Sequence, residues 1–163
     1  MAIPVYLWLK DDGGSEIKGE VSIVKREGSI EVVALEHGVA IPTDDSSGAV
    51  TGTRVHKPFV FTKHIDCSST YLFKAVTTGQ TLKEAKFSFF KINSAGTEEE
   101  YYSVTLENVK VASVAMAMHH VKEPSAQKKG HEEVVELRYE KATWFFKEGN
   151  LQHSDSWNER VSG

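Results

Sequence analysis

The sequence contains a single cysteine, Cys67, in 163 residues, so no disulfide bond can form within the chain. The fold must therefore be held together by packing, and the chain need not mature in an oxidising compartment. The N-terminus has only a short apolar run before Lys10, without the basic region and longer apolar region of a secretory signal. No run of about 20 apolar residues is present to cross a membrane. We expect synthesis in the cytoplasm, no membrane insertion, and any export by a route other than a cleaved signal peptide.

Charge of one sign is not concentrated anywhere in the chain. The 19 basic and 23 acidic residues give a net charge of -4 and are spread along the sequence. Nucleic acid is therefore not an expected partner, because binding to phosphates requires a clustered basic face. A chain of this length can bury roughly 68–70% of its unfolded surface around one core, so we expect one domain over residues 1–163.

The sequence also lacks the spacings that mark metal and nucleotide sites. None of its seven histidines follows a compact ligand spacing, and its glycine-rich stretches match neither a P-loop nor a dinucleotide-binding fingerprint. We therefore expect no metal and no cofactor, and we interpret the histidines as surface or loop residues. They are His37, His56, His64, His119, His120, His131 and His153.

Three groups of residues could be interpreted as catalytic. Cys67 follows His64 closely, but a thiol nucleophile needs its base in direct contact and a third group to orient the imidazole. The serines of residues 153–156 lack the Gly-x-Ser-x-Gly elbow. The glutamates at 98–100 would alternate between faces of a strand and are better explained as a solvated turn that leads into one. We conclude that the chain is not an enzyme.

Most of the chain alternates between apolar and polar residues with a period near two, which is typical of β-strands. The segment SIEVVALEH places Ile30, Val32 and Ala34 on one face. Aromatic and β-branched residues dominate three later segments: FSFFKI, YYSVTLENVKVASVAMAM and VVELRYEKATWFF. A turn at residues 148–150 precedes LQHSDSWNE and indicates a hairpin. We expect a mainly β protein with seven to nine strands.

One segment, at about residues 67–78, follows helical spacing instead. Its apolar face carries Leu72, Ala75 and Val76, and its opposite face carries Thr70, Lys74 and Thr77. An oxygen of Asp66, Ser68 or Ser69 could cap the start of the helix, and Gly79 could take the left-handed conformation that ends it. A short capped helix therefore explains the polar residues around Cys67 without catalysis.

The segment of residues 37–59 resists assignment, because its centre is rich in Gly, Ser, Thr and Asp while its ends are compatible with strands. Compact domains rarely contain an irregular connection of this length unless it is functional or disordered. Its ends favour an extended arm that projects from the domain and pairs elsewhere. The alternative is a flexible surface loop.

Seven stretches, in this order, resemble the haemolysin-coregulated protein (Hcp) family, which forms the tube of the bacterial type VI secretion system. They are MAIPVYLWLKDDGG, KREGSIEV, PFVFTKHID, LFKAVTTGQTLKEAKF, YYSVTLENVKVASVA, VELRYEKATW and HSDSWNE. Each stretch alone is short, but together they extend over essentially the whole chain.

The resemblance implies a flattened two-sheet β-barrel, or sandwich, with one α-helix and a long extended loop, assembled as a homohexameric ring. Such rings stack into a tube that the contractile sheath expels from the bacterial cytoplasm into a neighbouring cell. The implied partners are the sheath, the spike or tip protein, the baseplate proteins, and small effector proteins carried in the ring lumen. The family's core fold has no enzymatic activity and no cofactor.

The resemblance also implies roles for individual residues. The loop at about residues 38–58 resembles the family's extended loop that reaches the next ring, and its candidate stacking contacts are Ile41, Pro42, Arg54, Val55 and His56. The polar helix face would point toward solvent, a neighbouring subunit or the sheath. Candidate lumen residues are Glu31 and Glu36. A monomeric β-barrel that holds a small ligand in its interior is the alternative, since barrels of suitable size can do so.

Overall fold

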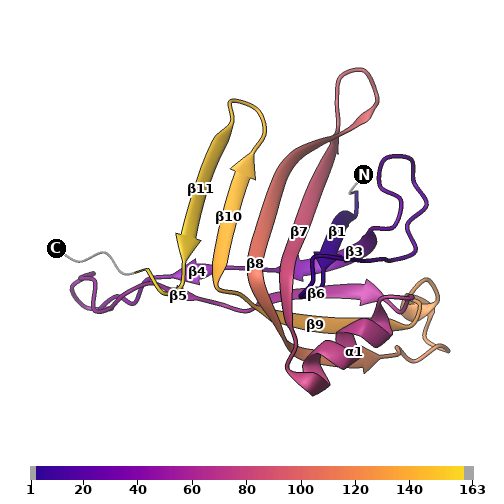
Figure 1. Cartoon of the computed structure of the whole chain (residues 1–163), viewed down its shortest axis with the longest axis horizontal. Coiled ribbons are helices and arrows are strands. Elements are labelled where there is room, and N and C mark those ends of the chain that lie inside the picture. The colour runs from indigo at the N-terminus through magenta and orange to yellow at the C-terminus, as the bar shows by residue number, and fades with distance from the viewer. Residues whose placement is uncertain (1–2, 160–163) are drawn as a thin grey trace.

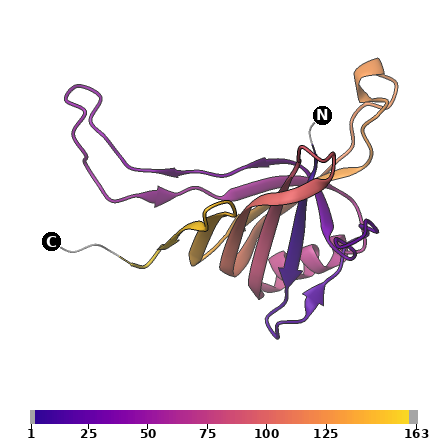
Figure 2. The same ribbon diagram turned by 90° about the horizontal axis from the view of Figure 1, so that it is seen from above.

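The chain folds into antiparallel strands and one α-helix in a computed structural model that describes residues 3–159 (Figures 1 and 2). Eight strands have six or more residues: β1 (Val5–Lys10), β3 (Ile30–Glu36), β6 (Phe59–His64), β7 (Thr81–Ile92), β8 (Glu98–Ala117), β9 (Glu132–Arg138), β10 (Lys141–Phe146) and β11 (Leu151–Ser156). The short elements are β2 (Glu16–Ile17), β4 (Val39–Ala40), β5 (Val55–His56) and the 3₁₀ helix η1 (Pro124–Ala126). The expected mainly β class is confirmed.

Part of a nine-stranded sheet, from β8 through β7, β1, β3 and β6 to β9, closes on itself and forms the barrel. The order of the whole sheet is β11-β10-β8-β7-β1-β3-β6-β9, with β2 beside β1, and β9 pairs again with β8 to complete the ring of strands. The 20-residue β8 makes this possible, because one of its edges pairs with β10 near Leu106 and with β9 beyond Lys110. The hairpin of β10 and β11 therefore continues the sheet beyond the barrel, where Figure 1 shows it standing beside the upper half of β8.

Large apolar side chains fill the interior of the barrel. Phe59 and Phe87 are fully buried and stack with ring centroids 4.1 Å apart, and Phe61 meets Phe87 edge-on at 5.4 Å. Leu7, Leu9, Ile30, Leu82, Leu106 and Leu137 are likewise fully buried. Burying such side chains away from water stabilises each by about 1.5–3 kcal/mol. The core of the barrel therefore consists of packed apolar side chains.

The helix α1 (Ser69–Thr78) is confirmed close to its expected bounds. Leu72 and Ala75 are buried in the core, and Val76 packs against it. Ser68 occupies the N-cap position without a side-chain cap, and the Asp66 carboxylate instead accepts hydrogen bonds from the backbone and hydroxyl of Ser68. Gly79 ends the helix at φ 68°, in the left-handed region that glycine adopts without steric cost.

Strand β3 differs from the expected pattern at one position. Ile30 and Val32 are buried as predicted, but Ala34 is exposed and Leu35 packs against the core in its place. The pairing of β3 with β6 shifts between Val32 and Ala34, and such a β-bulge reverses the side-chain phase of all residues that follow it. The regular alternation in the sequence gave no signal of this extra residue.

Candidate functional site

The projecting arm, residues 38–58, is a two-stranded β-ribbon that extends away from the barrel (Figure 2). Strands β4 and β5 pair through Val39 with His56 and Ala40 with Val55, and an isolated bridge joins Thr43 to Val50 nearer the tip. The expected extended arm is therefore present, but within this chain it pairs with itself.

A tight turn closes the tip of the arm. The Asp44 carboxylate accepts hydrogen bonds from the backbone N–H groups of Ser46 and Ser47, both at 2.8 Å, and these bonds lower the pKa of Asp44. Gly48 follows at φ 72°, a conformation available to glycine without strain. The Gly, Ser and Asp content that made this segment hard to assign is thus the composition that such a turn requires.

Large apolar side chains lie exposed along the arm. Val39, Ile41, Val50 and Val55 are between 41% and 61% exposed, and Pro42 is exposed beside them. Single exposed apolar residues are common, but a group of them on one projecting element marks a contact surface. Of the expected contact residues, Ile41, Pro42 and Val55 are therefore available to a partner.

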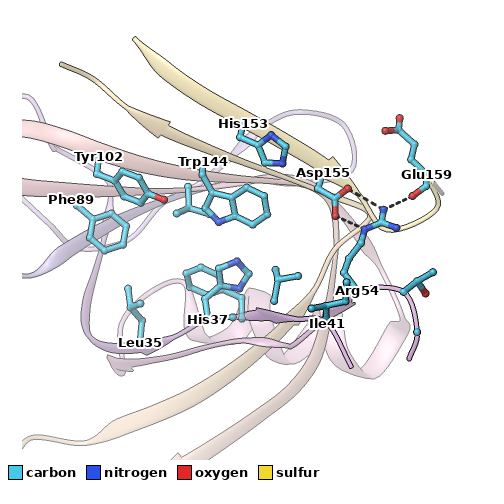
Figure 3. A pocket seen from close by; sticks show the side chains of 16 residues that line it. Leu35, His37, Ile41, Arg54, Phe89, Tyr102, Trp144, His153, Asp155 and Glu159 are labelled. Atoms are coloured by element: carbon cyan, nitrogen blue, oxygen red, sulfur yellow. Dashed lines mark hydrogen bonds and ion pairs between the residues drawn. The ribbon is translucent and has the colours of Figure 1, made fainter. Parts of the chain in front are cut away.

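The base of the arm is fastened to β11 by charged hydrogen bonds (Figure 3). Arg54 donates to both carboxylate oxygens of Asp155, at 2.9 Å and 3.0 Å, and to the backbone oxygens of Ser156 and Glu159. His56 Nε2 lies 2.6 Å from the same carboxylate, and its Nδ1 lies 2.7 Å from the Tyr139 hydroxyl. Arg54 and then His56 lower the pKa of Asp155, whereas burial raises that of Tyr139.

Two of the expected contact residues therefore differ from the prediction. His56 is only 3% exposed and contacts Asp155 and Tyr139 inside the chain, so it is not a surface residue. The Arg54 guanidinium is partly buried and donates hydrogen bonds from Nε and Nη2 at the base of the arm. The sequence contains no signal for this pairing, because Arg54 and Asp155 are 101 residues apart.

A groove of about 1250 Å³ separates the arm from the sheet of β7, β8, β10 and β11 (Figure 3). Trp144 lies at its centre and stacks on His37 and His153, with ring centroids 5.9 Å and 6.0 Å apart. Phe89 and Tyr102 line the wall of the sheet, where their rings meet edge-on at 5.5 Å. Aromatic side chains from segments distant in sequence thus make one continuous apolar surface.

His37 forms part of this surface without a polar partner. Its ring stacks on Phe59 at 4.9 Å, and neither of its nitrogens has a hydrogen-bond partner within residues 3–159. Burial, followed by the nearby charge of His56, lowers the pKa of His37. The interpretation of all seven histidines as surface or loop residues is therefore wrong for His56, whereas His37 does lie in the connection between β3 and β4.

Among the described residues, the side chains considered for catalysis form hydrogen bonds with groups outside the suggested catalytic sets. The exposed Cys67 donates its thiol hydrogen to the Lys18 carbonyl, and no hydrogen bond joins it to His64 among the described residues. Asp155 is held by Arg54 and His56, and the Ser154 hydroxyl bonds to that of Thr143.

Over residues 3–159 there is no group of three or more His, Cys, Asp or Glu side chains placed to hold a metal ion. That part of the chain also contains no helix long and apolar enough to cross a membrane.

The remaining predicted residues are all exposed. Thr70, Lys74 and Thr77 lie on the outer face of α1, opposite the buried Leu72 and Ala75. Glu31 and Glu36 point away from the core on β3. Their exposure is compatible with the expected roles, which stay predictions.

Comparison with known proteins identifies the class of protein. Residues 6–146 match the family model described as "Type VI secretion system effector, Hcp". The "Major exported protein" of Pseudomonas aeruginosa strain PAO1 is 36% identical, with the alignment extending over 100% of both chains. The structure of the Hcp1 protein from the E. coli EAEC 042 pathovar, solved as a double mutant, is 61% identical with a TM-score of 0.87 over 96% of this chain and 99% of that one. The secreted protein Hcp3 of P. aeruginosa is 28% identical with a TM-score of 0.78 over 97% and 100%.

The fold and these matches define a secreted component of type VI secretion systems. More specifically, the chain belongs to the Hcp family, which is not an enzyme family. The expected family and barrel fold are therefore confirmed.

Proposed function

We propose that this chain is the tube subunit of a type VI secretion system, which forms hexameric rings that stack into an expelled tube. It is made in the bacterial cytoplasm and leaves without a cleaved signal peptide. The rings carry small effector proteins in their lumen, and the tube contacts the sheath, the spike and the baseplate. Membership of the Hcp family supports this function, and the arm with its exposed apolar residues is the observation that carries it.

The arm supports stacking because it presents apolar area far from the barrel. Ile41 and Val50 are more than half exposed, and burying them against a second ring removes that area from water. A contact between an arm and a different surface of the next copy repeats without closing, which generates an open stack. Ile41, Pro42 and Val55 are the proposed contacts, with Arg54 and His56 acting at the base of the arm.

The open edge of the sheet supports ring formation. Strand β11 lies at the end of the strand order, and in the described part of the chain its one paired neighbour is β10. An exposed edge of this kind favours aggregation in a monomer, but contact with a neighbouring subunit in a closed ring removes it. Glu31 and Glu36 stay our candidates for the lumen, and the polar face of α1 for the outer surface.

Deleting residues 44–52 tests the role of the arm. This change removes the tip and Val50 but keeps β4, β5 and the contacts of Arg54 and His56. We expect the purified variant to have the ring mass of the parent by light scattering, and to form fewer and shorter tubes by negative-stain electron microscopy. Replacing the same residues with a glycine and serine loop of equal length is the matched control for chain length. Tubes as long and as frequent as those of the parent would contradict the stacking role.

A further inference from the structure

We propose that Asp155 is the positioning residue of the arm, which fixes the direction in which the arm leaves the barrel and thereby sets how readily rings stack. The inference rests on the proposed function and deepens it, because it gives the partly buried base of the arm a role in stacking in addition to the exposed apolar residues.

Asp155 is the point where the contacts of the arm converge. Its carboxylate accepts two hydrogen bonds from Arg54, in the side-by-side geometry that makes a guanidinium and carboxylate pair directional. His56 Nε2 binds the same carboxylate at 2.6 Å. Two residues on the returning side of the arm are thus held by one side chain of β11.

The neighbouring groups hold this arrangement in place. The Tyr139 hydroxyl meets the other ring nitrogen of His56, and Arg138 donates to the His56 backbone carbonyl at 3.3 Å. Trp157 packs edge-on against the His56 ring, with centroids 5.1 Å apart. His56 is almost completely buried among these groups, and their contacts restrict the orientation of its ring.

In the described chain, residues 39–53 of the arm form no hydrogen bond with the barrel. Over residues 39–53, the hydrogen bonds found in the described chain stay within the arm, such as Thr51 N–H to the Pro42 carbonyl at 2.9 Å. A two-stranded ribbon without packed neighbours is only marginally rigid. Its direction therefore depends on its base, where a small rotation would displace the distant tip.

The charge state of Asp155 agrees with this role. The hydrogen bonds from Arg54 are the largest cause of the lowered pKa of Asp155. The carboxylate is therefore ionised at neutral pH and accepts from the guanidinium with both oxygens. A neutral amide at this position has nearly the same shape, but it loses the ionic contact with Arg54 and can accept through one oxygen only. Asp155→Asn is therefore a variant that disturbs the base of the arm with little change in volume.

The test measures the arm directly and then measures stacking. In a Cys67→Ser background, spin labels at Ser47→Cys on the tip and Tyr71→Cys on the outer face of α1 report their separation by double electron–electron resonance. Labelled chains are diluted into unlabelled rings so that pairs within one chain dominate. The variants are Asp155→Asn, Arg54→Ala and the double variant, with Glu148→Gln in the exposed β10–β11 turn as the matched control.

We expect Asp155→Asn to keep the ring mass, to broaden the distance distribution, and to raise the concentration needed for tube formation about tenfold, as expected for loss of a charged hydrogen bond. The combined effect in the double variant should be smaller than the sum of the two single effects, because both changes break the same Arg54–Asp155 interaction. Glu148→Gln should match the parent.

An unchanged distance distribution in Asp155→Asn, or effects that add in the double variant, would overturn the proposal. If the parent forms no tubes, the proposed function fails, while the distances still decide whether Asp155 positions the arm.

Discussion

Lys63 on β6 and Glu133 on β9 lie directly opposite each other and form an ion pair in which both side chains are fully buried. The Ser69 hydroxyl accepts a hydrogen bond from Lys63 at 3.1 Å and donates one to Glu133 at 2.8 Å. Asp66 also lies 3.1 Å from the Lys63 ammonium. The first residue of α1 is thereby attached to two strands of the barrel.

Replacing one member of this pair should destabilise the protein strongly. Lys63→Met leaves the Glu133 carboxylate buried without its counter-charge, and such losses cost about 3–5 kcal/mol. Urea unfolding followed by circular dichroism measures this change. The double variant Lys63→Met with Glu133→Leu is the control, because it removes both charges and should recover much of the lost stability. A single variant as stable as the parent would show that the pair contributes nothing to folding.

The Lys63 and Glu133 pair also shows what sequence patterns miss. Residues 121–133 have the composition of an exposed loop of mixed charge, but Glu133 at their end belongs to β9 and is fully buried. Alternation predicted the strands well, because a two-residue period follows directly from backbone geometry. Pairing between charged residues 70 positions apart leaves no local pattern.

The same distinction applies to the arm. Its existence and its exposed Ile41 could be predicted from composition and resemblance, and the structure agrees. The inward role of His56 could not, because it depends on Tyr139 and Asp155 from the other end of the chain. The Trp144 stack in the groove was missed for the same reason.

The pKa of His37 predicts a dependence of stability on pH. Burial favours the neutral ring in the folded state, so the unfolded state binds more protons once the pH falls below the ordinary value of 6.5. The contribution of His37 to the free energy of unfolding should therefore be largest above pH 6.5. The free energy of unfolding should decrease as the pH is lowered below this value. Urea unfolding at a series of pH values should show a weaker decrease in His37→Phe, which keeps an aromatic ring in the stack. Equal decreases in parent and variant would contradict this prediction.

Gly19 should not tolerate a side chain. A Cβ atom there would lie 2.4 Å from the Ser29 carbonyl oxygen and 2.7 Å from Ile30 Cγ1, and the backbone oxygen cannot move independently of β3. We expect Gly19→Ala to lower the melting temperature through an overpacking cost of about 1–3 kcal/mol. Gly13→Ala is the matched control, since its nearest atom would be 3.5 Å away. Equal melting temperatures for the two variants would show that the loop relaxes freely.

Cys67→Ala should leave assembly intact. The thiol is exposed and makes one weak hydrogen bond to the Lys18 carbonyl, so its loss should change stability by less than about 0.5 kcal/mol. Light scattering of the purified variant should give the same ring mass as the parent. Dissociation of the ring would show that Cys67 has a role in assembly.

The division of β8 between two partners has a mechanical consequence. Its first half belongs to the sheet that extends past the barrel, its second half belongs to the barrel wall, and the covalent backbone joins them without a loop. A push or pull on the β7–β8 turn therefore travels along two continuous strands into the core. Under such a load, the ladder hydrogen bonds between neighbouring strands share the force and must break together. A domain built in this way should resist sliding of its strands past one another.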